Sequence, residues 1–387
     1  MPRQRSLRAS AHLLPVLLSL ALGVRCARVS TPVPYDVALR HGDAGADLPM
    51  RDRGTGEPMR DRGAGEGTAG DAARCDCPLG CDDAGCGEIV PSNGFTWGAV
   101  QTLDPLSGTY SINTTTCIGA YPTGGFLAGS IEGGACVFTL ASLVVPLGSV
   151  LAATGERPLV LLIRGGASVE GLVDVGAKRD VPGPGGGAPN TGMGAGGAGG
   201  CCAGGGGGGF GTAGGYSYGT AGSTYGNETL VPLVGGSGGG HGGQARGGAG
   251  GGALQISCAQ TLRVDGRITA GGGGGSSGGS SGGGGAGGAV LLEALSIVGT
   301  GVVAANGAGG GGVGDLPGED GDPTFTPAAG GTRAGAGATG ATLAGVGASG
   351  GGGGGGLGRV RYNLARPTIV PLVTSAAFSL GTVQGSR

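Results

Sequence analysis

Short segments in which apolar and polar residues alternate recur through the second half of the chain, and runs of glycine separate them. The clearest segment, ALQISCAQTLRVDG from Ala253, has apolar residues at Leu254, Ile256, Cys258, Leu262 and Val264. The residues between them include Gln255, Ser257 and Arg263. Because successive side chains of a strand point to opposite faces of a sheet, this pattern predicts strands with one buried face. Cys258 is expected on that buried face, either as a thiol or as a candidate for a disulfide.

A repeat appears when four glycines are aligned: Gly148, Gly171, Gly266 and Gly301. Two positions later the chain has Val150, Val173, Ile268 and Val303, and four positions later it has Ala152, Val175, Ala270 and Ala305. Five positions later stand Ala153, Gly176, Gly271 and Asn306, of which three tolerate positive φ. Each unit is therefore predicted to be a strand between two turns. The four residues at the second position are expected to stack in one column.

The spacing of these glycines favours a solenoid. The first two are 23 residues apart, a plausible single coil, and the last two are 35 apart, which leaves room for a glycine-rich insertion. The interval of 95 residues between the second and third implies a long excursion or hidden coils. The predicted fold is all-β, a parallel β-solenoid or β-helix-like domain over residues 95–364. Residues 357–364 are predicted to be its closing strand, residues 365–387 a C-terminal tail, and a β-sandwich with long loops is the alternative.

Glycine accounts for 102 of the 387 residues, most of them in these runs. The runs have no Gly-X-Y period, which excludes collagen. They are predicted to leave the solenoid on one side, because insertions cluster at fixed corners of such folds. Two states remain open for them: flexible coils, or extended poly-Gly helices whose backbone groups pair between neighbours.

The N-terminus has the pattern of a secretory signal peptide over residues 1–26. Three arginines precede the apolar stretch HLLPVLLSLALGV, and cleavage is predicted between Cys26 and Ala27. A lipidated Cys26 and a buried N-terminal helix are the alternatives. Residues 27–74 are predicted to be a disordered polar linker, because they repeat MRDRGTGEP as MRDRGAGEG with balanced charges and no apolar face.

A second apolar stretch, residues 135–153, is long enough to span a membrane. Its proline, glycine and β-branched residues fit two consecutive buried strands better, so no stable transmembrane span is expected. The formal net charge is −2, which offers no electrostatic basis for binding nucleic acid.

The cysteines favour disulfides, since an exported chain meets an oxidising environment. A Cys-rich segment over residues 75–94 contains Cys75, Cys77, Cys81 and Cys86, in a spacing unlike that of zinc sites, although zinc is the alternative. Three connectivities remain open for these four. A second bridge is expected between Cys117 and Cys136, and separate partners are expected for the vicinal Cys201 and Cys202.

Three further features suggest binding or chemistry. The acidic loop GDLPGEDGDP, with Asp315, Glu319, Asp320 and Asp322, is expected to be a solvated loop, with calcium binding as the alternative. Tyr216, Tyr218 and Tyr225 are candidates for a patch that contacts sugars, with local packing as the alternative. No phosphate-binding loop or catalytic triad is apparent, so neither an enzyme active site nor a cofactor is expected.

The repeats resemble a group of glycine-rich exported bacterial proteins of unknown function, often labelled PGRS-like. The segments that carry the resemblance are ERPLVLLIRGGASVEGLVDVGA, YGNETLVPLVGGSGGGHGG, GGGALQISCAQTLRVDGRITAGGGGG, GGAVLLEALSIVGTGVVAANGAGGGG and GGGGGGLGRVRYN. The resemblance supports the solenoid and brings no activity with it.

These features favour an exported, non-enzymatic structural or adhesive protein that is secreted or held at the cell surface. Its partner is expected to be a cell-surface or matrix polysaccharide. A polysaccharide-acting enzyme on a parallel β-helix is one alternative, although Glu170, Asp174, Arg263, Asp265 and Arg267 form no repeated charged column in the sequence. A protein that binds ice or mineral surfaces is the other, although no threonine ladder is present.

Overall fold

The computed structural model describes residues 79, 81–82, 85–86, 88–121, 125–314, 316–339, 344–366 and 370–385. In this part of the chain every regular element is a strand, and no helix is long and apolar enough to cross a membrane. The predicted signal peptide and linker lie outside the described residues, as do Cys26, Ala27, Cys75, Cys77 and Asp315.

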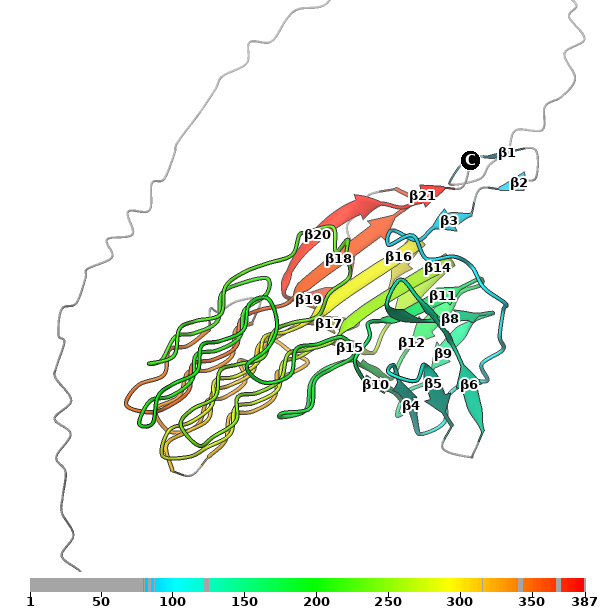
Figure 1. Cartoon of the computed structure of the whole chain (residues 1–387). Helices are drawn as coiled ribbons and strands as arrows, with labels where there is room; N and C mark the ends of the chain where they lie inside the picture. Colours follow the sequence, from blue (N-terminus) through cyan, green and yellow to red (C-terminus); the bar gives the residue numbers. More distant parts are fainter. Residues whose placement is uncertain are drawn as a thin grey trace, which may run out of the picture. The chain divides into compact units, whose positions relative to one another are not determined.

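Most strands belong to two large sheets (Figure 1). The eight-stranded sheet has the order β19 (Val373–Ser375), β17 (Val302–Ala304), β15 (Arg267–Thr269), β13 (Leu172–Asp174), β10 (Val150–Thr154), β4 (Thr109–Asn113), β5 (Ile118–Ala120) and β6 (Phe126–Ala128). The nine-stranded sheet has the order β20 (Ala377–Thr382), β18 (Arg359–Leu364), β16 (Ala289–Val298), β14 (Ala253–Val264), β11 (Leu159–Ile163), β8 (Ala135–Leu140) and β7 (Ser130–Glu132). Its two remaining strands are β12 (Ala167–Val169), which pairs with β14, and β9 (Leu143–Val145), which pairs with β12. Two small antiparallel pairs are β1 (Cys81–Asp82) with β2 (Gly85–Cys86), and β3 (Ile89–Val90) with β21 (Gln384–Gly385).

From β8 to β20 the chain passes back and forth between the two sheets. Each strand from β10 to β20 pairs in parallel with the equivalent strand of the preceding pass. The side chains between the sheets form the main hydrophobic core. The all-β class and the parallel pairing predicted from sequence are confirmed. The arrangement is compatible with a β-helix or solenoid-like fold.

The predicted column is correct for three of its four members. Val173 pairs in register with Ile268, and Ile268 with Val303, and all three are fully buried. In the first unit, however, Leu151 pairs with Val173, while Val150 pairs with Leu172. The prediction for Val150 is therefore wrong by one residue.

The close stacking of successive turns explains this shift. A Cβ on Gly171 would lie 2.3 Å from the carbonyl oxygen of Ser149, and one on Gly266 would lie 2.1 Å from that of Gly171. These glycines are needed for space. In the first unit the equivalent position is Ser149, while the neighbouring Gly148 has a φ of 81° and forms the turn before it. Aligning Gly148 with Gly171 and Gly266 therefore equates a glycine needed for its positive φ with glycines needed for space, and this shifts the alignment by one residue.

Two other local predictions need correction. Residues 135–153 contribute to three strands, β8, β9 and β10, and not to two. Within the predicted closing strand, residues 359–364 form β18, but β20 pairs with its other side, so the sheet continues beyond it. The strands β19, β20 and β21 lie within residues 373–385, the segment expected to be a tail.

The long glycine-rich segments all leave the sheets at one corner, as predicted. Residues 175–252, 270–288 and 305–358 each connect a strand of the eight-stranded sheet to the next strand of the nine-stranded sheet. Figure 1 shows them as green, yellow and orange segments that run together away from the strands. We refer to them as the glycine bundle.

Backbone hydrogen bonds hold the bundle together. The N–H groups of Gly206 and Gly209 donate to residues 194–197, and those of Gly205 and Gly208 donate to residues 281–284. Within residues 205–209, N–H groups three residues apart therefore donate to the same neighbouring segment. The carbonyl groups of residues 204–208 accept from segments that contain Gly219, Gly222, Gly240, Gly353 and Gly356. Unpaired backbone groups are costly when buried, and the bundle satisfies them by pairing between segments.

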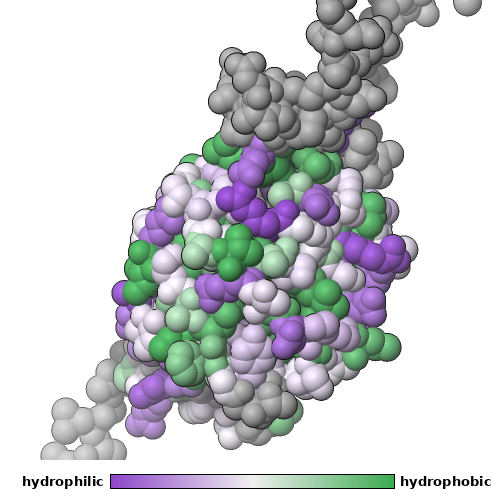
Figure 2. Space-filling view, turned by 90° about the vertical axis from the view of Figure 1, so that its right-hand side faces the viewer, coloured by the Kyte–Doolittle hydropathy of each residue, from purple (hydrophilic) through white to green (hydrophobic). Residues whose placement is uncertain are grey.

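The first end of the sheets is closed by antiparallel strands. β5 is antiparallel to β4 and β6, and β7 is antiparallel to β8. A disulfide joins Cys117, just before β5, to Cys136 in β8, the second bridge suggested by the sequence. Figure 2 views the side nearest β5, β6 and β8, where hydrophilic and hydrophobic residues are intermixed over the surface.

Candidate binding surface

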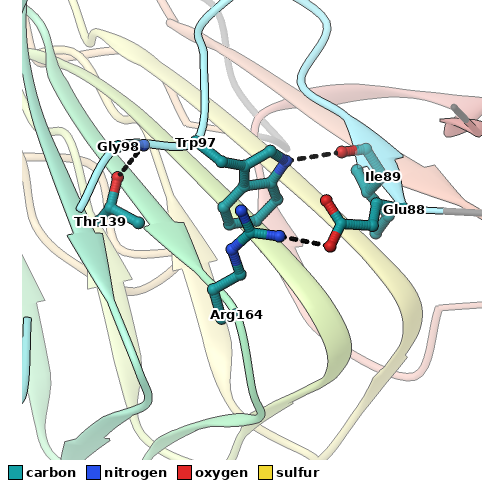
Figure 3. Close-up of polar contacts among 6 residues, drawn as sticks. All are labelled: Glu88, Ile89, Trp97, Gly98, Thr139 and Arg164. Carbon is teal, nitrogen blue, oxygen red and sulfur yellow. Dashed lines mark hydrogen bonds and ion pairs between the residues drawn. The ribbon is translucent and has the colours of Figure 1, made fainter. Parts of the chain in front are cut away.

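Part of the outer face of the nine-stranded sheet is covered by residues 88–101, which we call the strap. Figure 3 shows Trp97 of the strap against Arg164, whose guanidinium carbon lies 4.7 Å from the centre of the indole ring. Arg164 also forms an ion pair with Glu88, and the Trp97 indole N–H donates to the carbonyl of Ile89 at 3.0 Å. The Gly98 N–H donates to Oγ1 of Thr139 at 3.0 Å. These contacts hold the strap against β8 and the end of β11.

A buried carboxylate lies under the same strap. Glu293 is fully buried and accepts hydrogen bonds from Gln255 Nε2 at 2.9 Å, Ser257 Oγ at 2.7 Å and Asn363 Nδ2 at 3.0 Å. The backbone N–H and the hydroxyl of Ser92 in the strap donate to it as well. Ser257, Glu293 and Asn363 are direct partners on β14, β16 and β18. Five donors therefore converge on one carboxylate, as a buried charge requires.

Sequence reasoning missed this cluster. It placed Gln255 and Ser257 on the polar face of their strand, which is correct, but that face is fully buried here. The detectable signal was a run of polar residues on the outer side of three consecutive strands. The cluster is enclosed by the strap, so it anchors a chain segment and presents no open surface to a ligand.

The farthest ends of the bundle segments form a surface that we call the tip. It includes the turn at Cys201, whose carbonyl accepts from the Ser280 hydroxyl at 3.1 Å, and the turn that holds Tyr216 and Tyr218. Tyr216 is 60% exposed and Tyr218 is 71% exposed. The turn that holds them is fixed: the Ser217 hydroxyl donates to the Gly351 carbonyl at 2.6 Å, and the Tyr216 carbonyl accepts from the Gly347 N–H at 2.9 Å.

Tyr225 does not belong to this surface. Its ring packs against Phe210 with centroids 4.8 Å apart, and its hydroxyl donates to the Gly235 carbonyl and accepts from Ser237. Burial raises the pKa of Tyr225 to about 12. Of the three candidate tyrosines, the structure leaves two available for binding.

The remaining cysteines are divided between the tip and the core. Cys201 and Cys202 are exposed at the tip, with Sγ atoms 3.4 Å apart. Cys81 and Cys86 face each other as backbone partners in the β1–β2 pair. Cys258 is fully buried between the sheets, as expected, and burial raises the pKa of its thiol.

These positions predict a large difference in thiol reactivity. In the folded protein Cys258 is expected to resist iodoacetamide at pH 8, because it is inaccessible and remains protonated. Cys201 is expected to be alkylated at least about a hundredfold faster, as exposed thiolates are the reactive form. Peptide mass spectrometry after timed alkylation measures both rates. Equal labelling of Cys258 and Cys201 before unfolding would contradict the burial of Cys258.

Charged residues at the stacked turns lie along an open groove of about 510 Å³ lined by Glu170, Asp265 and Arg267. The Asp265 carboxylate pairs with Arg263 Nε at 2.5 Å and accepts from the Thr300 N–H at 3.2 Å. The structure thus brings together several charges that looked isolated in the sequence. Asp174 is separately paired with Lys178 at 3.0 Å.

The described acidic-loop residues use their carboxylates within the fold. Asp320 Oδ1 accepts backbone N–H groups from Arg179 at 2.9 Å and Gly274 at 2.8 Å, and Glu319 Oε2 accepts from Ala329 at 3.0 Å. Among the residues that the structure describes, no group of three or more histidine, cysteine or acidic side chains is arranged to hold a metal ion. The loop instead joins neighbouring segments of the bundle.

No protein-family model matches the sequence, and no significant match is found among curated proteins or solved structures.

Proposed function

We propose that this chain is an exported, non-enzymatic structural or adhesive protein of the cell surface or matrix. In this proposal a β-solenoid carries packed poly-Gly helices, which display the tip to a surface polysaccharide. The three-residue period of the bundle contacts supports poly-Gly helices, since extended helices of this type have three residues per turn. The resemblance to glycine-rich exported proteins is part of the same proposal.

The proposal depends mainly on a pair of exposed tyrosines in a turn whose backbone is held in place by hydrogen bonds. Tyr216 and Tyr218 present large aromatic surfaces at the tip, and the Ser217 and Gly347 contacts hold their backbone in place. A tyrosine ring combines a wide apolar face with a polar hydroxyl and loses little entropy on binding. A polysaccharide chain offers matching apolar ring faces and hydroxyls.

The polysaccharide-acting enzyme remains the alternative, with the groove at Glu170 and Asp265 as its natural location. The Asp265 carboxylate is already engaged by Arg263 and the Thr300 N–H, which supports a structural role for it. Turnover of a polysaccharide by the purified protein would favour the enzyme.

A binding assay tests the proposed function. The purified chain is incubated with a panel of insoluble cell-wall and matrix polysaccharides, and the bound fraction is measured against protein concentration. For the polysaccharide that it binds, replacement of both Tyr216 and Tyr218 by alanine is expected to weaken affinity at least about tenfold. The matched control is Phe126→Ala, which removes an equally exposed aromatic ring (74%) from β6. No binding to any member of the panel, or equal affinity of the double variant, would contradict the tyrosine contact.

A further inference from the structure

The strand β20 forms an edge of the nine-stranded sheet. It pairs with β18 on one side, and no strand of the described residues pairs with its other side. A free edge presents backbone N–H and C=O groups that another strand can bind, and proteins usually guard such edges with charged residues or proline. The sequence of β20, AFSLGT, contains neither.

Two columns of the hydrophobic core end on β20 with exposed side chains. One column consists of Cys136, Leu159, Leu254, Val290, Val360 and Phe378, and the other of Phe138, Leu161, Ile256, Leu292, Tyr362 and Leu380. All members before the last are at most 2% exposed, whereas Phe378 is 54% exposed and Leu380 is 44% exposed. Stacked folds need a polar cap at each end to remain soluble monomers. Among the residues that the structure describes, exposed core side chains stand at this end in place of a cap.

The opposite end differs in construction. There the antiparallel strands β5, β6 and β7 end the sheets, the Cys117–Cys136 disulfide fastens them, and polar residues are mixed over the surface (Figure 2). The edge strands β6, β7 and β19 have three residues each, whereas β20 has six, so β20 is the longest free edge among the described strands of the two sheets.

We propose that β20 is a homodimer interface, in which a second copy of this chain pairs its own β20 antiparallel across a two-fold axis at Ser379. This register places Phe378 opposite Leu380 of the second copy, and Leu380 opposite its Phe378. Each open column is then covered by the other, and no like charges meet. One self-complementary patch forms a closed dimer, the commonest symmetric assembly.

The contact between the two copies is expected to be small. Six residues of β20 span about 20 Å, and two sheet layers add about 20 Å in the other direction, so each copy buries roughly 400 Å². A standard stable interface buries about 800 Å² per partner. The dimer is therefore expected to be weak and reversible, so that its formation depends on protein concentration.

Sedimentation equilibrium of the full chain over a wide concentration range tests the interface. The wild-type protein is expected to shift from monomer to dimer as concentration rises. The variant Phe378→Lys with Leu380→Lys is expected to dimerise at least about a hundredfold more weakly, because four cations would meet at the interface. Phe126→Lys, at the other end of the sheets, is the matched control and is expected to dimerise like the wild type.

Amide hydrogen exchange on the wild-type protein provides a second test that does not depend on a variant folding. The amides of β20 that face the free edge are expected to gain protection as the dimer forms. A wild-type protein that stays monomeric, a lysine double variant that dimerises normally, or a loss of dimer with Phe126→Lys overturns the proposal. Protection of the β20 edge already in the monomer shows that another segment of the same chain covers it, and overturns the proposal as well. Growth into open filaments contradicts the two-fold geometry.

Discussion

Replacement of Gly207 by alanine is expected to lower the free energy of unfolding by about 3 kcal/mol, at the upper end of the cost of overpacking. A Cβ at this position would lie 1.8 Å from the carbonyl oxygen of Gly354. The Gly207 N–H also donates to Gly215, and its carbonyl accepts from Gly222. The added methyl group cannot be accommodated unless neighbouring segments move and break such bonds. Urea unfolding of the purified variant measures the loss.

The control is Gly279→Ala. Gly279 is exposed, and a Cβ added there would have no heavy atom within 4 Å. It is expected to change the free energy of unfolding by less than about 0.5 kcal/mol. Equal stability of the two alanine variants would show that the segments around Gly207 are not packed as described.

Replacement of Glu293 by alanine is expected to cost about 3–5 kcal/mol, because several buried donors lose their acceptor together. Gln255, Ser257 and Asn363 would be left without the carboxylate, and so would Ser92 in the strap. The strap is therefore expected to loosen as well. Urea unfolding measures the first effect, and faster amide exchange over residues 91–98 measures the second.

Glu88→Ala is the control for this second prediction. It removes the ion pair between Glu88, which is 56% exposed, and Arg164, but leaves the buried cluster intact. Exposed ion pairs contribute little, so a loss below about 1 kcal/mol is expected. If Glu88→Ala and Glu293→Ala lose similar stability, the buried cluster is not what holds the strap.

The parallel sheets were predictable because their signal is local. Alternation of apolar residues placed Ile268, Val303 and Cys258 on the buried face correctly, and the spacing of the glycines located the corner at which the insertions leave. The shift at Val150 arose because one residue type serves two purposes. Gly148 provides a positive φ, whereas Gly171 and Gly266 provide room for a neighbouring carbonyl, and the sequence does not distinguish these roles.

The pairing of segments within the glycine bundle and the burial of the polar cluster were not predicted for a different reason. Each glycine of residues 204–209 depends on partners up to about 150 residues away, and glycine carries no side-chain pattern that reveals them. Gln255 and Ser257 read as solvent-facing because their outer face is covered by the strap, whose own sequence has no obvious apolar period. The sequence also did not show that Tyr225 is packed while Tyr216 and Tyr218 are exposed, because Tyr225 packs on Phe210, which lies 15 residues earlier in the chain.

Hydrogen bonds between the glycine segments keep the bundle ordered. Hydrogen exchange of the backbone amides of residues 205–209, 283–285 and 352–356, followed by mass spectrometry, tests it directly. Slow exchange, comparable to that of β14 and β16, is the result we predict. Exchange at the rate of an unstructured chain in these segments, while β14 and β16 stay protected, would contradict it.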